Sequence, residues 1–185
     1  MPDTLTIPEL AAGTWTIDPA HTEVGFSVRH LMVSKVKGTF KSFEGTITVP
    51  KDVSQAAVEV KVDMASIDTG EDNRDKHLRS ADFFSTEEFP HMTFSSMSVK
   101  KAGSDYQVEG NLTIHGVTKP VTFDVEFNGV GPDPWGGVRA GFSAVTEISR
   151  KEFGIDMDMP LEGGGVVVGD KVKIMLEVEA IRQQG

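Results

Sequence analysis

The 185-residue chain contains no cysteine, so it can form no disulfide bond, no thiolate metal site and no cysteine nucleophile. It also lacks any run approaching the ~18 apolar residues that a membrane-spanning helix requires. The first 13 residues carry no lysine or arginine and contain two prolines, which does not fit a secretory signal peptide. These absences predict a cytoplasmic protein without a transmembrane segment.

Positive charge is scarce as well. The chain has 18 lysines and arginines against 28 aspartates and glutamates, a net charge of -10. Such a chain repels phosphate backbones, so we expect no nucleic-acid partner. The length and the hydrophobic fraction of 38% suit one globular domain that buries its own core.

The pattern that is present has a period of two residues. Apolar and polar residues alternate, which is typical of strands that bury one face. The clearest segments are 58–63, 106–114, 121–127, 138–144 and 172–179, and further strands are predicted at 14–18, 23–29, 38–49 and 92–100. Phe40 and Phe43 cannot share a face of an unbroken strand, nor can Phe94 and Met97, so we expect a bulge or bend within each pair.

Two segments break the alternation: residues 31–36 form a short apolar run, and residues 71–79 are highly charged and predict a brief helix. Residues 115–120 predict a hairpin loop between two strands. The whole predicts an all-β fold, an antiparallel β-barrel of about eight strands with one or two short helices. It would occupy residues 14–182 after an N-terminal extension at 1–13. A β-sandwich would bury the same faces, so the pattern alone does not separate the two.

Several longer motifs are more specific. They are WTIDPAH at 15–21, VGFSVRHL at 24–31, SIDTG at 66–70, NRDKHLR at 73–79, DFF at 82–84 leading to FP at 89–90, and GNLTIHGVTKPV at 110–121. In this order they resemble the YceI family of bacterial proteins. The resemblance implies an elongated, lipocalin-like barrel, a homodimer, and an interior tunnel that holds a polyisoprenoid or a related long-chain amphiphile.

The resemblance makes the inward apolar residues, as a set, candidate ligand-binding residues, although any single one of them is better explained as part of a packed core. These candidates are Val24, Phe26, Val28, Phe40, Phe94, Leu112, Phe123, Phe142 and Ile174. His30 directly follows an apolar strand and is the candidate to meet the polar end of the ligand.

Two basic groups could also meet a charged headgroup, or could be solvated faces paired with neighbouring acids such as Asp72 with Lys76 and Asp75 with Arg79. One group is Arg29, Lys35, Lys37 and Lys41, and the other is Arg74, Lys76 and Arg79. The Gly-, Met- and Pro-rich segment with Asp156, Asp158 and Glu162 is interpreted as a rim or dimer contact.

The five histidines show no metal-ligand spacing, and no catalytic motif is present, so no metal, cofactor or catalytic residue is predicted. The favoured function is non-enzymatic binding, with sequestration or transport of a lipid of the polyisoprenoid or isoprenoid quinone type. Two alternatives stay open. One is a small barrel enzyme that acts on an apolar substrate with His30 or a nearby carboxylate as acid or base, and the other is a stress-associated scaffold with a filled core.

Overall fold

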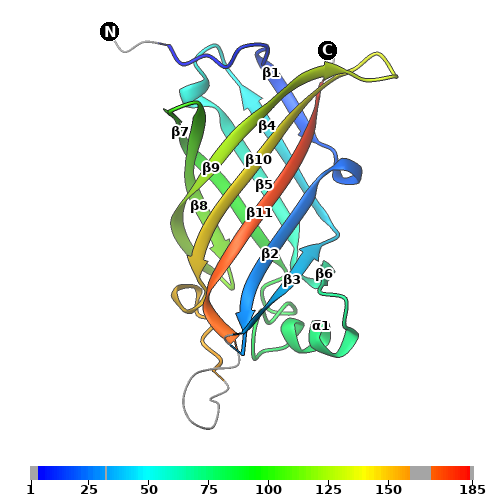
Figure 1. Cartoon of the computed structure of the whole chain (residues 1–185), viewed down its shortest axis with the longest axis vertical. Helices are drawn as coiled ribbons and strands as arrows, with labels where there is room; N and C mark the ends of the chain where they lie inside the picture. Colours follow the sequence, from blue (N-terminus) through cyan, green and yellow to red (C-terminus); the bar gives the residue numbers. More distant parts are fainter. Residues whose placement is uncertain (1–3, 32, 159–167, 184–185) are drawn as a thin grey trace.

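The computed structural model describes residues 4–31, 33–158 and 168–183 (Figure 1). The strands are β1 (Gly13–Ile17), β2 (Glu23–His30), β3 (Ser34–Phe40), β4 (Phe43–Val49), β5 (Ala57–Asp63), β6 (Ile67–Asp68), β7 (His91–Ala102), β8 (Asp105–Ile114), β9 (Val117–Pro132), β10 (Val138–Ser149) and β11 (Val168–Arg182). The helices are α1 (Asp72–Arg79) and the 3-10 turns η1 (Pro19–His21), η2 (Val53–Gln55), η3 (Met64–Ser66) and η4 (Arg150–Phe153).

Eight of these strands close into a barrel. The order is β1-β4-β5-β7-β8-β9-β10-β11, every neighbouring pair is antiparallel, and β11 returns to pair with β1. The remaining strands form a branch, in which β2 pairs with β11 beyond the end of β1 and carries β3 and then β6. Because the sheet closes on itself, the predicted barrel is confirmed and the sandwich alternative is wrong.

The barrel is elongated, and its two ends differ (Figure 1). We call the end with the N-terminal segment and the β9–β10 turn the upper end, and the end with α1 and the tip of the β2–β3 hairpin the lower end. Among the described residues, no helix combines the length and the apolar character needed to cross a membrane.

Both predicted irregularities occur. β3 ends at Phe40 and β4 begins at Phe43, so the chain bends between the two rings. The β7–β8 register shifts between Ser96 and Ser98, just after Phe94. Gly110 lies at this shift, and a Cβ atom there would lie only 2.6 Å from the Phe94 ring and 2.5 Å from the Ser95 carbonyl oxygen. The bulge therefore depends on a position without a side chain.

Of three other local predictions, the structure confirms the helix at 71–79 and corrects the segment 31–36 and the hairpin loop at 115–120. The helix is confirmed: Glu71 accepts hydrogen bonds from the first backbone amides of α1 and begins it at Asp72. The segment 31–36 was wrongly excluded from the sheet, because Ser34 already begins β3. The hairpin loop is also shorter than predicted. His115 and Gly116, with φ of 56° and 74°, form a two-residue turn whose positive φ angles are typical of type I′, and β9 begins at Val117.

The interior contains two clusters of buried apolar side chains. The lower cluster includes Phe26, Phe40, Phe94 and Phe153, and the upper cluster is built around Trp15. Trp15 is 1% exposed, and its indole nitrogen donates to the carbonyl of Ala11. The inward side chains of the strands leave space between them, and this space is the candidate site.

Candidate functional site

The larger space inside the barrel is a cavity of about 150 Å³ in its upper part. Its wall comes from strands all round the barrel and includes Val58, Leu112, Phe123, Ala144 and Leu176. An engineered cavity of about this volume with a similar apolar lining stays dry and admits one benzene molecule. The upper cavity in this conformation therefore has room for an apolar group of about that size.

A smaller cavity of about 80 Å³ lies in the lower part. Val28 of β2, Val172 of β11 and Ile148 of β10 line it, and Phe83 and Phe153 contribute from the segments that cover the lower end. The two cavities share three lining residues, Val24, Met92 and Ile174, so they lie end to end along the barrel. We call these three residues the waist.

The walls of both cavities present no polar surface. A polar group placed there would lose its hydrogen bonds to water without replacement, at a cost of roughly 2–7 kcal/mol. The interior is therefore suited to hydrocarbon. Met92 at the waist is the most adaptable of the three dividing side chains, because an unbranched thioether can take up many rotamers.

The structure places nine predicted ligand-binding residues on these walls. Val24, Phe94, Leu112, Phe123, Phe142 and Ile174 line the upper cavity, and Val24, Phe26, Val28, Phe40 and Ile174 line the lower one. Alternation along the strands was enough to find them, because an inward position of a barrel strand faces either packed core or cavity. That they bind a ligand stays a prediction.

His30 is placed differently. It is the last residue of β2, and it is not among the residues that line either cavity. Its carbonyl accepts hydrogen bonds from the amide of Val33 and the hydroxyl of Ser34, which closes the turn of the β2–β3 hairpin. The contacts described for His30 are therefore hydrogen bonds of its backbone that hold the hairpin turn.

Sequence reasoning missed the part of the wall that comes from the N-terminal extension. Ile7 and Leu10 line the upper cavity, and Ile7 is 9% exposed. The extension is held by a hydrogen bond from the Leu5 amide to Asp52 (3.2 Å) and by one from the Val53 amide to the Leu5 carbonyl (2.8 Å). No periodicity marks this segment, because it is neither strand nor helix. It covers the upper end of the barrel.

A buried arginine at the lower end was also missed. Arg150 is 4% exposed, and its guanidinium donates to the carbonyls of Ile155, Val168 and Gly169 and to the carboxylate of Asp158. These bonds fix the ends of the β10–β11 connection against the barrel. An arginine is rarely buried, so nothing in its local sequence points to this role.

The proposed rim segment falls partly outside the described residues, which exclude Glu162. Asp158, by contrast, forms ion pairs of 2.8 Å with both Lys151 and Arg150. The hydrogen bonds from Lys151 and Arg150 hold the pKa of the Asp158 carboxyl below its usual range. The described part of the segment is thus tied to its own barrel.

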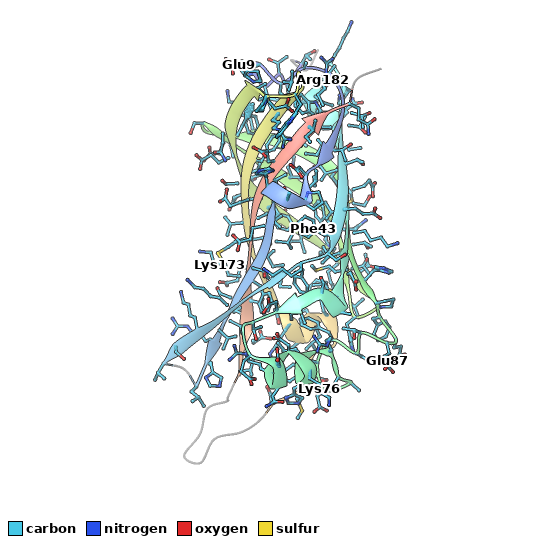
Figure 2. All side chains as sticks on the ribbon, turned by 90° about the vertical axis from the view of Figure 1, so that its right-hand side faces the viewer. Glu9, Phe43, Lys76, Glu87, Lys173 and Arg182 are labelled. Atoms are coloured by element: carbon cyan, nitrogen blue, oxygen red, sulfur yellow. The ribbon has the colours of Figure 1, made fainter. Side chains whose placement is uncertain are left out.

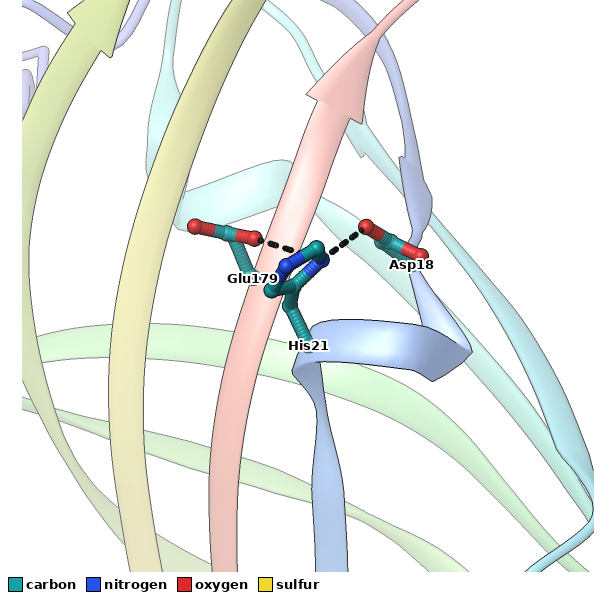
Figure 3. A group of neighbouring side chains, drawn as sticks. All are labelled: Asp18, His21 and Glu179. Atoms are coloured by element: carbon teal, nitrogen blue, oxygen red, sulfur yellow. Dashed lines mark hydrogen bonds and ion pairs between the residues drawn. The ribbon is translucent and has the colours of Figure 1, made fainter. Parts of the chain in front are cut away.

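A cluster of ionisable side chains lies on the barrel wall where β1 gives way to β2 (Figure 3). His21 Nδ1 is 2.8 Å from Asp18 Oδ2 and 3.4 Å from Glu179 Oε2, a spacing that could in principle hold a metal ion. The Arg139 guanidinium already donates to both of these carboxylate oxygens, at 2.7 Å and 3.0 Å, and also to Asp133. Arg139 and His21 lower the pKa of Asp18 from 3.8 to about 2. The cluster is therefore best described as an ion-pair network that ties η1 to β10 and β11.

The two basic groups have different surroundings. Arg74 of α1 donates to the hydroxyl and the carbonyl of Thr69, and Asp75 accepts from the amide and the hydroxyl of the same residue. The expected pairs of Asp75 with Arg79 and of Asp72 with Lys76 are wrong, because neither occurs among the ion pairs of the described residues. The group on β2 and β3 is exposed.

Comparison with known proteins agrees with this architecture. The model of the YceI-like domain matches residues 15–180. Protein YceI of Salmonella newport is 44% identical over 165 residues, which cover 89% of this chain and 83% of that protein. The crystal structure of Burkholderia cenocepacia BcnA superposes with a TM-score of 0.76 at 25% identity, covering 88% of this chain and 98% of BcnA.

A polyisoprenoid binding domain from Saccharophagus degradans shares the fold, with a TM-score of 0.71 at 14% identity, covering 91% of this chain and 98% of that domain. The family match, the identity to the Salmonella protein and the closed barrel point the same way. The chain belongs to the YceI-like family.

Proposed function

We propose that this protein binds a long apolar lipid, of the polyisoprenoid or isoprenoid quinone type, in the barrel interior and sequesters or carries it without chemical change. The observation that carries the proposal is the pair of wholly apolar cavities that lie end to end and meet at the waist. The polyisoprenoid binding domain of S. degradans supports this ligand class through its shared fold.

The size of the cavities defines what binding must involve. A space that admits about one benzene ring cannot take a chain of several isoprene units without movement of the walls. The waist must open for the chain to occupy both cavities, and we expect Met92, the most adaptable of its three side chains, to move most. We expect any polar headgroup to lie outside the two cavities, because the guanidinium of Arg150, which lines the lower one, is already bonded to protein oxygens and the rest of the walls is apolar.

The same walls argue against catalysis inside the barrel. An acid or base must approach a reacting atom to within about 3 Å, and no described nitrogen or oxygen atom presents surface to either cavity. A filled scaffold is disfavoured by the cavities themselves. We therefore place the protein among binding proteins. The single domain at 14–182, the homodimer and the cytoplasmic location remain predictions, which limited proteolysis, light scattering and cell fractionation would check.

Native mass spectrometry of freshly purified protein, followed by organic extraction, tests the proposed function. We expect a fraction of the chains to carry an added mass that extracts as a prenyl lipid. Protein that carries no such mass and also fails to bind a fluorescent prenyl probe would overturn the proposal. A covalently changed probe after incubation would instead favour the enzyme.

A further inference from the structure

One stretch of this acidic chain carries four of its 18 lysines and arginines and no acidic residue. Residues 24–43 contain Arg29, Lys35, Lys37 and Lys41 and not one aspartate or glutamate, in a chain with 28 acidic residues and a net charge of -10. This stretch begins directly after Glu23, the first residue of β2, continues through the turn and β3, and ends at Phe43, where β4 begins. The hairpin is therefore a local exception to the charge of the molecule.

The fold adds one more cation, Lys173 of β11, to three of these. Arg29 lies directly opposite Lys35 across the β2–β3 ladder, and Lys37 and Lys173 lie on either side of Ser27. All four side chains are exposed, and Figure 2 shows Lys173 on the outside of the barrel wall.

No ion pair of the described residues includes any of these four cations. The one acid directly opposite any of them in the strand register is Glu147, across from Lys173. Like charges directly opposite each other destabilise a sheet, so the Arg29–Lys35 pair does not serve folding.

The tip of the hairpin is apolar. Val33 is 85% exposed and Leu31 is 40% exposed, and these are two of the five large hydrophobic side chains that the described chain leaves in solvent. Both belong to the turn of the β2–β3 hairpin, whose tip lies at the lower end of the barrel (Figure 1), and Val28 of β2 lines the lower cavity. We call Leu31, Val33 and the four cations Arg29, Lys35, Lys37 and Lys173 the hairpin face.

An exposed apolar tip flanked by unpaired cations matches the chemistry of one partner. We propose that the hairpin face docks the lower end of the barrel onto an anionic phospholipid bilayer. The cations lie against the headgroups, and Leu31 and Val33 enter the boundary between headgroups and acyl chains. Acidic residues elsewhere do not prevent this, because charges farther away than the Debye length, about 8 Å at physiological salt and about 14 Å at 50 mM, are largely screened.

The purpose of the docking rests on the proposed function, but the docking itself does not. It is tested with protein and vesicles alone. We expect the full-length protein to float with vesicles of phosphatidylcholine containing about 30% phosphatidylglycerol at about 50 mM salt, and not with pure phosphatidylcholine or at about 500 mM salt. A lysine near an anionic surface strengthens partitioning by about fivefold. The double variant Lys35→Glu, Lys37→Glu should therefore weaken partitioning by at least about 25-fold.

A matched control separates the hairpin face from net charge. Lys100 and Lys101 are exposed near the end of β7, toward the upper end, so Lys100→Glu, Lys101→Glu changes the net charge equally. It should leave partitioning within about twofold of the wild type, because these lysines lie beyond the reach of the surface potential. For the tip, Val33→Ser should reduce partitioning several-fold, whereas Trp135→Ser at the upper end, where the side chain is 76% exposed, should not.

Three outcomes would overturn the proposal. The first is wild-type protein that does not float with anionic vesicles at low salt. The second is an equal loss of vesicle partitioning in the two lysine double variants. Binding to an acidic polypeptide or to duplex DNA without binding to vesicles would assign the hairpin face to another partner. Val33→Ser keeps the test valid even if the Lys35, Lys37 variant fails to fold, because an 85% exposed side chain contributes little to the core.

Discussion

Two alanines on one strand offer a sharp test of the interior. Ala144 and Ala140 both belong to β10, and an even spacing places them on the same face. Ala144 lines the upper cavity, whereas Ala140 is 1% exposed and lines neither cavity. Replacing each by phenylalanine adds the same phenyl ring, in one case toward open space and in the other into packed core.

The expected effects on stability differ for that reason. The cavity of about 150 Å³ has room for one ring. Burying a phenylalanine side chain contributes about 1.5–3 kcal/mol, so Ala144→Phe should leave the free energy of unfolding within about 1 kcal/mol of the wild type or raise it. Ala140→Phe has no space to fill and should cost about 1–3 kcal/mol or more in strain. For a chain of this size, each kcal/mol corresponds to about 2–4 °C in Tm.

For binding of a prenyl probe, we expect Ala144→Phe to be the more harmful of the two variants. Ala144→Phe places its ring in the space that a prenyl chain would enter, so it should weaken binding of a fluorescent prenyl probe at least about tenfold. Ala140→Phe, if folded, should retain most of the affinity. Urea unfolding of the apo proteins beside probe titration measures both quantities. The reasoning fails if Ala144→Phe is as destabilising as Ala140→Phe, or if it binds the probe as tightly as the wild type.

Three further variants test other parts of the structure. Gly110→Ala should cost at least about 1–3 kcal/mol in urea unfolding, because the added methyl group would meet backbone atoms at the β7–β8 bulge; an unchanged midpoint would contradict the proposed crowding. Because the pKa of Asp18 is lowered from 3.8 to about 2, its carboxylate stabilises the fold fully above about pH 4 and loses this effect as the pH falls toward 2. Asp18→Asn should therefore flatten the dependence of stability on pH between 4 and 2, and an unchanged slope would refute the role of the network. Ile7→Asp should release the N-terminal extension and weaken probe binding several-fold, while circular dichroism still reports an intact barrel.

How much of the fold the sequence predicts depends on how regular each segment is. Residues 121–127 of β9 alternate without error, so the inward face of this segment was found correctly, and the register shift of the β9–β10 pair lies just beyond it. The bulge beside Phe94 was also found, because a slip in parity is itself a signal. The start of β3 was missed. Residues 31–33 of the apolar run precede the strand, and only the pairing with β2 reveals where it begins.

The residues of the candidate site could likewise be predicted only where they belong to regular strands. Inward strand residues such as Leu112 could be predicted from periodicity, and they line the cavity. Ile7 could not, because its role depends on a non-periodic segment that crosses the end of a barrel formed by later residues. Arg150 could not either, since three of its four partners are backbone carbonyls, which leave no mark on the sequence.

On our proposals, the apolar walls determine how much lipid the protein binds, and the hairpin face determines how fast the lipid exchanges with a membrane. A five-carbon isoprene unit is worth roughly 4 kcal/mol on transfer from water, at ~0.8 kcal/mol per CH₂, so four or five units would already approach the practical limit of non-covalent affinity. That driving force almost vanishes when the lipid comes from a bilayer, because hydrocarbon then exchanges one apolar surrounding for another. Occupancy at equilibrium is therefore governed by the fit of the chain between the two cavities and by the waist. The rate of exchange is governed by the time the lower end spends at a membrane, which on our proposal depends on the hairpin face. Variants of Ala144 and of Lys35 should accordingly affect different quantities, the first the amount of lipid bound and the second the speed of its transfer.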